Sequence, residues 1–285
     1  MNRIDQKFKE LKENGKKALI TFITAGDPDL EATVEIVKEM ERQGADLVEL
    51  GIPYSDPVAE GPVIQEANRR ALENRIKIKD IMGAVKKMRK EVKIPLLYLL
   101  YFNCILQYGP GRFFADCADS GIDGVIVPDL PFEERGEIEE AAEKSGVYII
   151  TLVSPTSEDR IERITKNAKG FLYCVSSLGV TGIREEFKTD FEKFFAHINR
   201  AGSIPKAIGF GISTPEHVRQ LKGYCDGLIV GSAIVNRIGQ SSCAGEAVKN
   251  VGDYVRALRE ALDYGLPGKG KLSWNLSAKY PRCRK

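Results

Sequence analysis

Short runs rich in β-branched and aromatic residues alternate along the chain with longer stretches in which apolar residues recur at helical spacing. This alternation is typical of parallel strands that are joined by crossover helices. It occurs eight times. The predicted strands are Leu19–Thr24, Asp46–Leu50, Leu96–Phe102, Gly124–Val127, Tyr148–Val153, Phe171–Val175, Lys206–Phe210 and Gly227–Val230.

A helix is predicted after each strand. The helices begin near Asp29, Pro62, Gly111, Phe132, Ser157, Lys188, Thr214 and Gly245, and a further helical stretch covers Lys77–Glu91. Eight strand–helix units in about 260 residues match a closed (β/α)₈ barrel in count and size, because open sheets more often stop at five or six strands. We therefore predict an α/β fold, a single-domain (β/α)₈ TIM barrel over residues 1–264, followed by a basic, flexible tail over 265–285.

Composition and charge change this picture little. The chain has 285 residues, 43% of them hydrophobic and 29% charged, which is ordinary for a globular protein. Its net charge is +2, but the last 22 residues hold six Lys or Arg and no acidic residue, so the barrel itself is mildly acidic. Such a surface argues against nucleic acid as a partner.

The apolar runs and the cysteines bear on location. The longest apolar run, Ile94–Phe102, contains a proline and is far shorter than the ~20 residues that span a bilayer, so no membrane segment is expected. The first 17 residues are charged and lack the apolar core of a secretory signal. Without such a signal we expect a cytoplasmic protein. The six cysteines form no CxxC pair, so neither a zinc motif nor a redox motif is expected.

Glu49 is the first candidate catalytic residue. In the second predicted strand, Leu47 and Glu49 share one face, and helices cover the other face, so Glu49 is expected to point into the barrel mouth. Active sites of such barrels lie at this end. Burial among apolar groups raises the pKa of a carboxyl and suits it to acid–base work near neutral pH. The alternative is a strand-end glutamate that reaches solvent or a lysine.

The loop Gly51–Pro62 brings two more carboxylates, Asp56 and Glu60, to the same end of the barrel. Its three prolines stiffen it. Taken alone the loop is a weak signal, because Ser-Asp-Pro and Glu-Gly-Pro are also ordinary turn sequences.

Glycines follow the last three strands, at Gly179–Gly182, Gly209–Ser213 and Gly231–Ser232. Backbone N–H groups at helix starts bind phosphate, and the loops after strands seven and eight form the recurrent phosphate site of these barrels. We interpret the glycines as a site for a phosphorylated substrate, with plain turn glycines as the alternative. No Walker-type or dinucleotide-binding glycine motif occurs in the sequence.

Other catalytic chemistries lack suitable residues. The two histidines, His197 and His217, fall on helices away from strand ends, so a histidine metal site or a Ser-His-Asp triad is not expected. Lys206 is the only lysine in a predicted strand, and it lies roughly 13 Å below the mouth, too deep for a Schiff base with substrate.

Five motifs together resemble the tryptophan synthase α subunit family across nearly the whole chain. They are DLVELGIPYSDPVAEGPVIQ (46–65), VPDLPFEE (127–134), YCVSSLGVTG (173–182), IGFGIS (208–213) and VGSAIV (230–235). The resemblance implies a (β/α)₈ lyase that cleaves indole-3-glycerol phosphate into indole and glyceraldehyde 3-phosphate. It also implies an α2β2 assembly, in which indole passes to a β subunit that carries pyridoxal phosphate, with no cofactor in this chain.

The resemblance assigns roles to individual positions. Glu49 would protonate indole C3 and assist proton transfer at the glycerol hydroxyl, and Glu60 stands where the family has an aspartate that meets the indole N–H. Glu60 is thus a departure, longer by one methylene. The positions that would wall the indole pocket or brace the carboxylates are Phe22, Leu99, Tyr101, Ile126, Tyr173, Phe210 and Ile229. The closing loop and phosphate cradle would include Thr181, Gly182, Gly211, Gly231 and Ser232. Asp56 and Asp129 would communicate with the β subunit.

Three alternatives remain open at this point. The chain could be a stand-alone lyase that releases free indole, or a barrel isomerase or epimerase that acts on another phosphorylated sugar. It could also be a catalytically weak barrel that binds and activates a β subunit, and the glutamate at position 60 is the sole support for that hypothesis.

Overall fold

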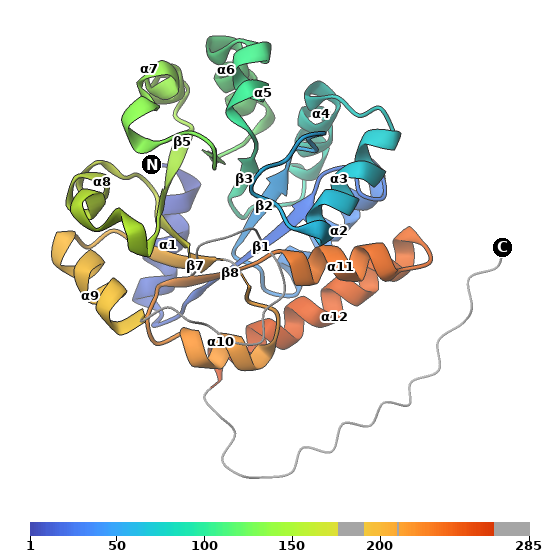
Figure 1. Ribbon diagram of the computed structural model, residues 1–285. Helices are drawn as coiled ribbons and strands as arrows, with labels where there is room; N and C mark the ends of the chain where they lie inside the picture. Colours follow the sequence, from blue (N-terminus) through green and yellow to red (C-terminus); the bar gives the residue numbers. More distant parts are fainter. Residues whose placement is uncertain (176–190, 210, 265–285) are drawn as a thin grey trace, which may run out of the picture.

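The computed structural model describes residues 1–175, 191–209 and 211–264, and within them eight parallel strands close into a barrel in chain order (Figure 1). This arrangement confirms the predicted (β/α)₈ fold. The strands are β1 (Ala18–Thr24), β2 (Leu47–Gly51), β3 (Leu96–Leu99), β4 (Gly124–Ile126), β5 (Tyr148–Val153), β6 (Leu172–Val175), β7 (Lys206–Gly209) and β8 (Gly227–Val230). The predicted tail lies outside the described residues.

Helices surround the barrel, and most of them follow their strands as expected (Figure 1). They are α2 (Leu30–Arg42), α3 (Pro62–Glu73), α4 (Ile78–Met88), α6 (Pro110–Ser120), η1 (Phe132–Glu134), α7 (Gly136–Ser145), η2 (Pro155–Arg160), α8 (Ile161–Asn167), α9 (Phe191–Ala201), α10 (Pro215–Leu221) and α12 (Ala244–Asp263). Side-chain caps fix two starts, since Asp29 accepts from the Ala32 N–H and Thr214 from the His217 N–H.

Three of the described helices were not predicted: α1, α11 and a short helix over Phe102–Tyr108 that is described below. Helix α1 (Arg3–Glu13) precedes the first strand, and its apolar residues Ile4, Phe8 and Leu11 recur at helical spacing and pack into the barrel interior. Helix α11 (Ser232–Gln240) lies between β8 and α12, where no helix was expected. A short extra helix after the last strand is a known phosphate-binding element of this fold, so α11 bears on the site.

The third predicted strand, Leu96–Phe102, is too long. Strand β3 ends at Leu99, Tyr101 is the N-cap of helix α5 (Phe102–Tyr108), and the Phe102 N–H donates to the Asp129 carboxylate at 2.9 Å. The apolar run therefore changes from strand to helix. The bond that fixes the change comes from the loop after β4 and is invisible in the run itself.

The strands alternate as a closed barrel requires. Residues such as Ile20, Leu47 and Ile229 form one apolar cluster inside the barrel, whereas Val48 and Leu50 belong to the larger cluster between the strands and the helices. Position 49 must therefore face inward, next to Phe22 on β1 and Leu97 on β3 in the strand register.

Candidate active site

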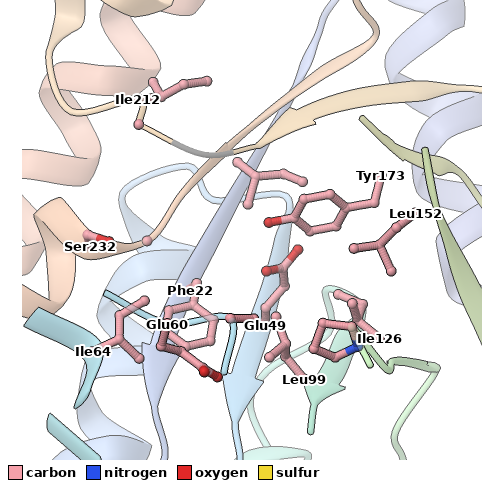
Figure 2. Close-up of a pocket in the computed structure, with 15 residues that line it drawn as sticks. Phe22, Glu49, Glu60, Ile64, Leu99, Ile126, Leu152, Tyr173, Ile212 and Ser232 are labelled. Carbon is pink, nitrogen blue, oxygen red and sulfur yellow. The ribbon is translucent and has the colours of Figure 1, made fainter. Parts of the chain in front are cut away.

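A cavity opens at the carboxy-terminal end of the strands (Figure 2). Ten of its lining residues were predicted site residues: Phe22, Glu49, Glu60, Leu99, Ile126, Tyr173, Gly211, Ile229, Gly231 and Ser232. They come from strands that are far apart in the sequence and from the segments that follow those strands, and the closed barrel brings the carboxyl ends of the strands together. The wall is mainly apolar, which suits a flat aromatic group.

Glu49 is fully buried at the centre of this cavity. Neither carboxyl oxygen has a hydrogen-bond partner among the described residues, and burial away from water raises the pKa of Glu49 to about 8. Figure 2 shows its carboxyl group pointing toward the hydroxyl end of Tyr173. At neutral pH Glu49 is therefore mostly protonated, so it is able to donate a proton to a bound molecule and to take one back.

Glu60 is buried as well, but it is held by other groups. Its carboxylate accepts a hydrogen bond from the Tyr101 hydroxyl, and that hydroxyl accepts bonds from the N–H groups of Val58 and Ala59 at 2.8 and 2.9 Å. Burial raises the pKa of Glu60, while the bond from Tyr101 opposes that rise. The Gln65 side chain donates to the Glu60 carbonyl at 2.8 Å, which fixes the backbone at this position.

Tyr101 braces a carboxylate, which is one of its two expected roles. It does not line the cavity but lies behind Glu60, to which its hydroxyl donates. Its ring packs on Tyr54, with centroids 4.8 Å apart. Tyr101 is thus a support for the second carboxylate and for the loop that carries it.

The glycines after β7 and β8 form one edge of the cavity. Gly211 has φ of +84°, a conformation that glycine adopts without strain, and Gly231 is the N-cap of α11. A Cβ atom on Gly231 would lie 3.3 Å from the Phe22 side chain, so the close approach favours glycine. Together with Ser232, these residues place backbone groups and a helix start at the cavity edge, where an anion is favoured.

The remaining predicted residues divide into two groups. Asp56 and Asp129 are exposed beside the mouth and do not line the cavity. Asp56 accepts a hydrogen bond from Ser55, and Asp129 from the Phe102 N–H. Phe210, Thr181 and Gly182 lie outside the described residues.

Five lining residues were missed: Ala59, Ile64, Pro128, Leu152 and Ile212. Leu152 could have been found, because it has the inward parity of Ile150 on the same strand, and parity is the signal that identified Glu49. The other four lie in loops or at a helix start, where periodicity gives no direction.

The described residues contain no group of three or more His, Cys, Asp or Glu side chains placed to hold a metal ion. Among the described helices we find no candidate for a membrane span. His217 lies on helix α10, the helix after β7, as expected. It is buried behind the loop after β7, and its Nδ1 accepts from the Ser213 N–H at 3.4 Å. Lys206 lies at the opposite end of the barrel, bonded to Asn199 at 2.7 Å.

Comparison with known proteins agrees with this geometry. A family model described as tryptophan synthase alpha chain matches residues 8–263. The tryptophan synthase alpha chain of Thermoanaerobacter pseudethanolicus is 55% identical over 262 residues, which cover 92% of this chain and 100% of that protein. The one from Clostridium kluyveri is 49% identical over 263 residues, with the same two coverages.

Solved structures show the same likeness. The tryptophan synthase alpha chain from Legionella pneumophila subsp. pneumophila superposes with a TM-score of 0.82 at 38% identity and covers 92% of this chain and 98% of its own. A structure of Mycobacterium tuberculosis tryptophan synthase has a TM-score of 0.84 at 29% identity and covers 93% of this chain and 99% of its own.

Proposed function

This chain belongs to the tryptophan synthase alpha chain family and catalyses the alpha reaction of tryptophan biosynthesis, the cleavage of indole-3-glycerol phosphate, and we propose that Glu49 and Glu60 carry the chemistry. The products are indole and glyceraldehyde 3-phosphate. The observation that carries the proposal is a fully buried glutamate without a polar partner among the described residues, in an apolar cavity at the catalytic end of the barrel.

Glu49 acts as the acid and the base of the retro-aldol step. Its raised pKa keeps a proton on the carboxyl at neutral pH, and that proton passes to indole C3. The bond between C3 and the side chain then breaks as the side-chain hydroxyl loses its proton and becomes the aldehyde. The carboxylate of Glu49 is the group that recovers this proton, so it ends the cycle protonated and the products are neutral indole and the aldehyde.

Glu60 stabilises the charge that this step creates. Protonation at C3 spreads positive charge over the ring toward the indole N–H, and a carboxylate near that N–H lowers the energy of the intermediate. The bond from Tyr101 favours the ionised form of Glu60 and holds it in place before the substrate binds. The two glutamates thus have different environments and different roles.

The phosphate group of the substrate binds at the glycine edge. Gly211, Gly231 and Ser232 present backbone groups there, and the start of α11 adds a favourable dipole for an anion. Apolar residues such as Leu99, Ile126 and Leu152 then cover the indole ring on the other side of the cavity. The distance between the phosphate edge and Glu49 would set which substrate carbon meets the acid.

Membership in this family implies a beta subunit partner. We propose that two copies of each subunit assemble as α2β2, that pyridoxal phosphate belongs to the beta subunit, and that this chain needs no cofactor of its own. Asp56 and Asp129 are exposed at the mouth, in keeping with a role at the subunit contact. A cytoplasmic location stays part of the proposal.

An indole-release assay on the purified chain tests the proposed function. We expect indole to form from indole-3-glycerol phosphate with the chain alone and to form faster when a beta subunit is added. A rate that does not respond to the beta subunit would favour the stand-alone lyase. The absence of indole in both conditions would contradict the proposed chemistry, and binding of an indole-bearing ligand would exclude the sugar-phosphate isomerase.

A further inference from the structure

We propose that Tyr254, on helix α12, is a positioning residue that holds the two halves of the phosphate site at a fixed separation. The inference rests on the proposed function, because it assigns a support to the phosphate edge formed by the loop after β7 and by the start of α11. Tyr254 itself does not line the cavity.

The hydroxyl of Tyr254 fixes the first half, the loop after β7. It donates to the Ser213 carbonyl at 2.7 Å, and both residues are buried. The Ser213 N–H donates to His217 Nδ1 at 3.4 Å. The peptide groups on both sides of Ser213 are therefore anchored, directly after the cavity residues Gly211 and Ile212.

The ring of Tyr254 contacts the second half, helix α11. The guanidinium carbon of Arg237 lies 3.4 Å from the ring centroid, close enough for a cation–π interaction. Arg237 also donates to the Ala233 carbonyl at 2.7 Å, in the first turn of the helix. One tyrosine thus touches the loop through its hydroxyl and the helix through its ring.

The chemistry of Tyr254 suits a permanent support. Burial raises its pKa to about 12, so the hydroxyl keeps its proton and remains a donor throughout the working pH range. A buried carbonyl that loses its donor also pays a desolvation cost, so the loop is expected to shift when the hydroxyl is removed. Phosphate-binding N–H groups would then lose their alignment, whereas Leu99, Ile126 and Leu152, which lie on other strands, would keep their places around the indole.

Tyr254→Phe tests this directly, because it removes the hydroxyl and keeps the ring under Arg237. We expect the affinity for sn-glycerol 3-phosphate, measured by calorimetry, to fall about 3- to 10-fold, which is the range for one lost hydrogen bond. The affinity for indole should stay within about twofold. In the cleavage assay we expect KM to rise and kcat to stay within about twofold of wild type.

Two further variants make the test specific. Tyr148→Phe is the matched control, since its hydroxyl donates to Asp5 at 2.7 Å at the amino-terminal end of the barrel, and it should leave both affinities unchanged. Arg237→Met keeps the hydroxyl of Tyr254 but removes the cation over its ring. It should weaken glycerol 3-phosphate binding in the same direction by about twofold, and it keeps the test decisive if Tyr254→Phe does not fold.

Three results would overturn the inference. If Tyr254→Phe binds glycerol 3-phosphate as tightly as the wild type does, the positioning role of Tyr254 is refuted and the proposed phosphate edge still stands. Equal losses for indole and for glycerol 3-phosphate would show a general structural role. A wild-type chain that does not bind glycerol 3-phosphate would refute the phosphate edge itself, and the positioning role with it.

Discussion

At the amino-terminal end of the barrel Asp123 is buried between two arginines, whereas at the carboxy-terminal end Glu49 is buried with no hydrogen-bond partner among the described residues. Asp123 accepts from Arg89 at 2.6 Å, from Arg3 at 2.8 Å and from the Leu96 N–H at 3.0 Å. Both carboxyl groups are removed from water. One is fully compensated, and the other keeps its hydrogen-bonding capacity for a ligand.

Two further aspartates near the amino-terminal end are hydrogen-bonded in a similar way to Asp123. Asp46 and Asp226 also stand directly before a strand, and each accepts from a backbone N–H at the start of a neighbouring strand, that of Leu19 at 2.9 Å and that of Lys206 at 3.0 Å. Arg259 pairs with Asp46 at 2.9 Å. Aspartates before β2, β4 and β8 thus tie adjacent strands together. This barrel therefore uses hydrogen-bonded aspartates for strand register at one end and a buried glutamate for chemistry at the other.

The largest effect is expected for Glu49→Gln, which keeps the shape of the side chain and removes its acid. We expect the turnover of indole-3-glycerol phosphate to fall by about 10³-fold or more, within the range for loss of a general acid–base group. Substrate affinity should be nearly unchanged, because no described polar group binds this carboxyl. Steady-state indole release with a parallel binding titration measures both. Activity above a tenth of wild type would remove Glu49 from the mechanism.

At the other end, Asp123→Asn should affect stability and not chemistry. It leaves the buried Arg89 guanidinium without its counter-charge, and we expect the free energy of unfolding to fall by about 3 kcal/mol. The turnover of the folded fraction should be unchanged. Chemical denaturation measures the first quantity, and Asp119→Asn is the control, because Asp119 pairs with Lys86 on the exposed surface. A large loss of kcat in Asp123→Asn would contradict the claim that Asp123 contributes to stability and not to chemistry.

The unpaired carboxyl should also give the wild type a characteristic pH dependence of stability. The ordinary pKa of 4.5 rises to about 8 in the folded protein, so the unfolded chain loses its proton first as the pH rises. Stability from this group is fully present below pH 4.5 and declines toward pH 8. Compared with Glu49→Gln, the wild type should lose stability by on the order of 1 kcal/mol per pH unit across that window. Denaturation at several pH values measures the free energy of unfolding of both proteins. The same pH dependence in the two proteins would refute the raised pKa of Glu49.

Sequence reasoning reached the deeper part of this site because strand parity is a strict rule. Leu47 and Glu49 share a face in any regular strand, and eight strand–helix units leave the barrel as the simplest closed arrangement. The position of Glu49 and of the glycines after β7 and β8 therefore follows from the pattern alone. The same rule would have identified Leu152.

The rest depends on contacts between segments that are distant in the chain. The end of β3 depends on the Asp129 carboxylate, and the place of Tyr101 behind Glu60 depends on the path of the loop after β2. The strand-tying role of Asp123 requires the knowledge that β3 and β4 are neighbours with a given register. Hydrophobic periodicity carries no information of this kind, because it describes one element at a time.

The smallest effect is expected for substitutions of Glu60, which is hydrogen-bonded, whereas Glu49 in the same cavity has no hydrogen-bond partner among the described residues. Glu60→Ala removes the carboxylate beside the ring and should lower turnover about tenfold, within the range for a lost hydrogen bond to a charged group. Glu60→Asp should be tolerated or should improve turnover, because an aspartate is the family residue at this position. Steady-state indole release measures both, with Glu66→Ala on the exposed face of α3 as the control.

The two variants together decide what the extra methylene of Glu60 does. The Tyr101 hydroxyl and the Gln65 bond hold the side chain and the backbone at this position, so the longer residue is accommodated by a fixed loop rather than by free movement. If Glu60→Asp is faster, the longer side chain places the carboxylate off its best position, and an error of about 1 Å is enough for such a difference. If Glu60→Ala keeps the full rate, the position is idle, and Glu49 alone accounts for the chemistry of the mouth.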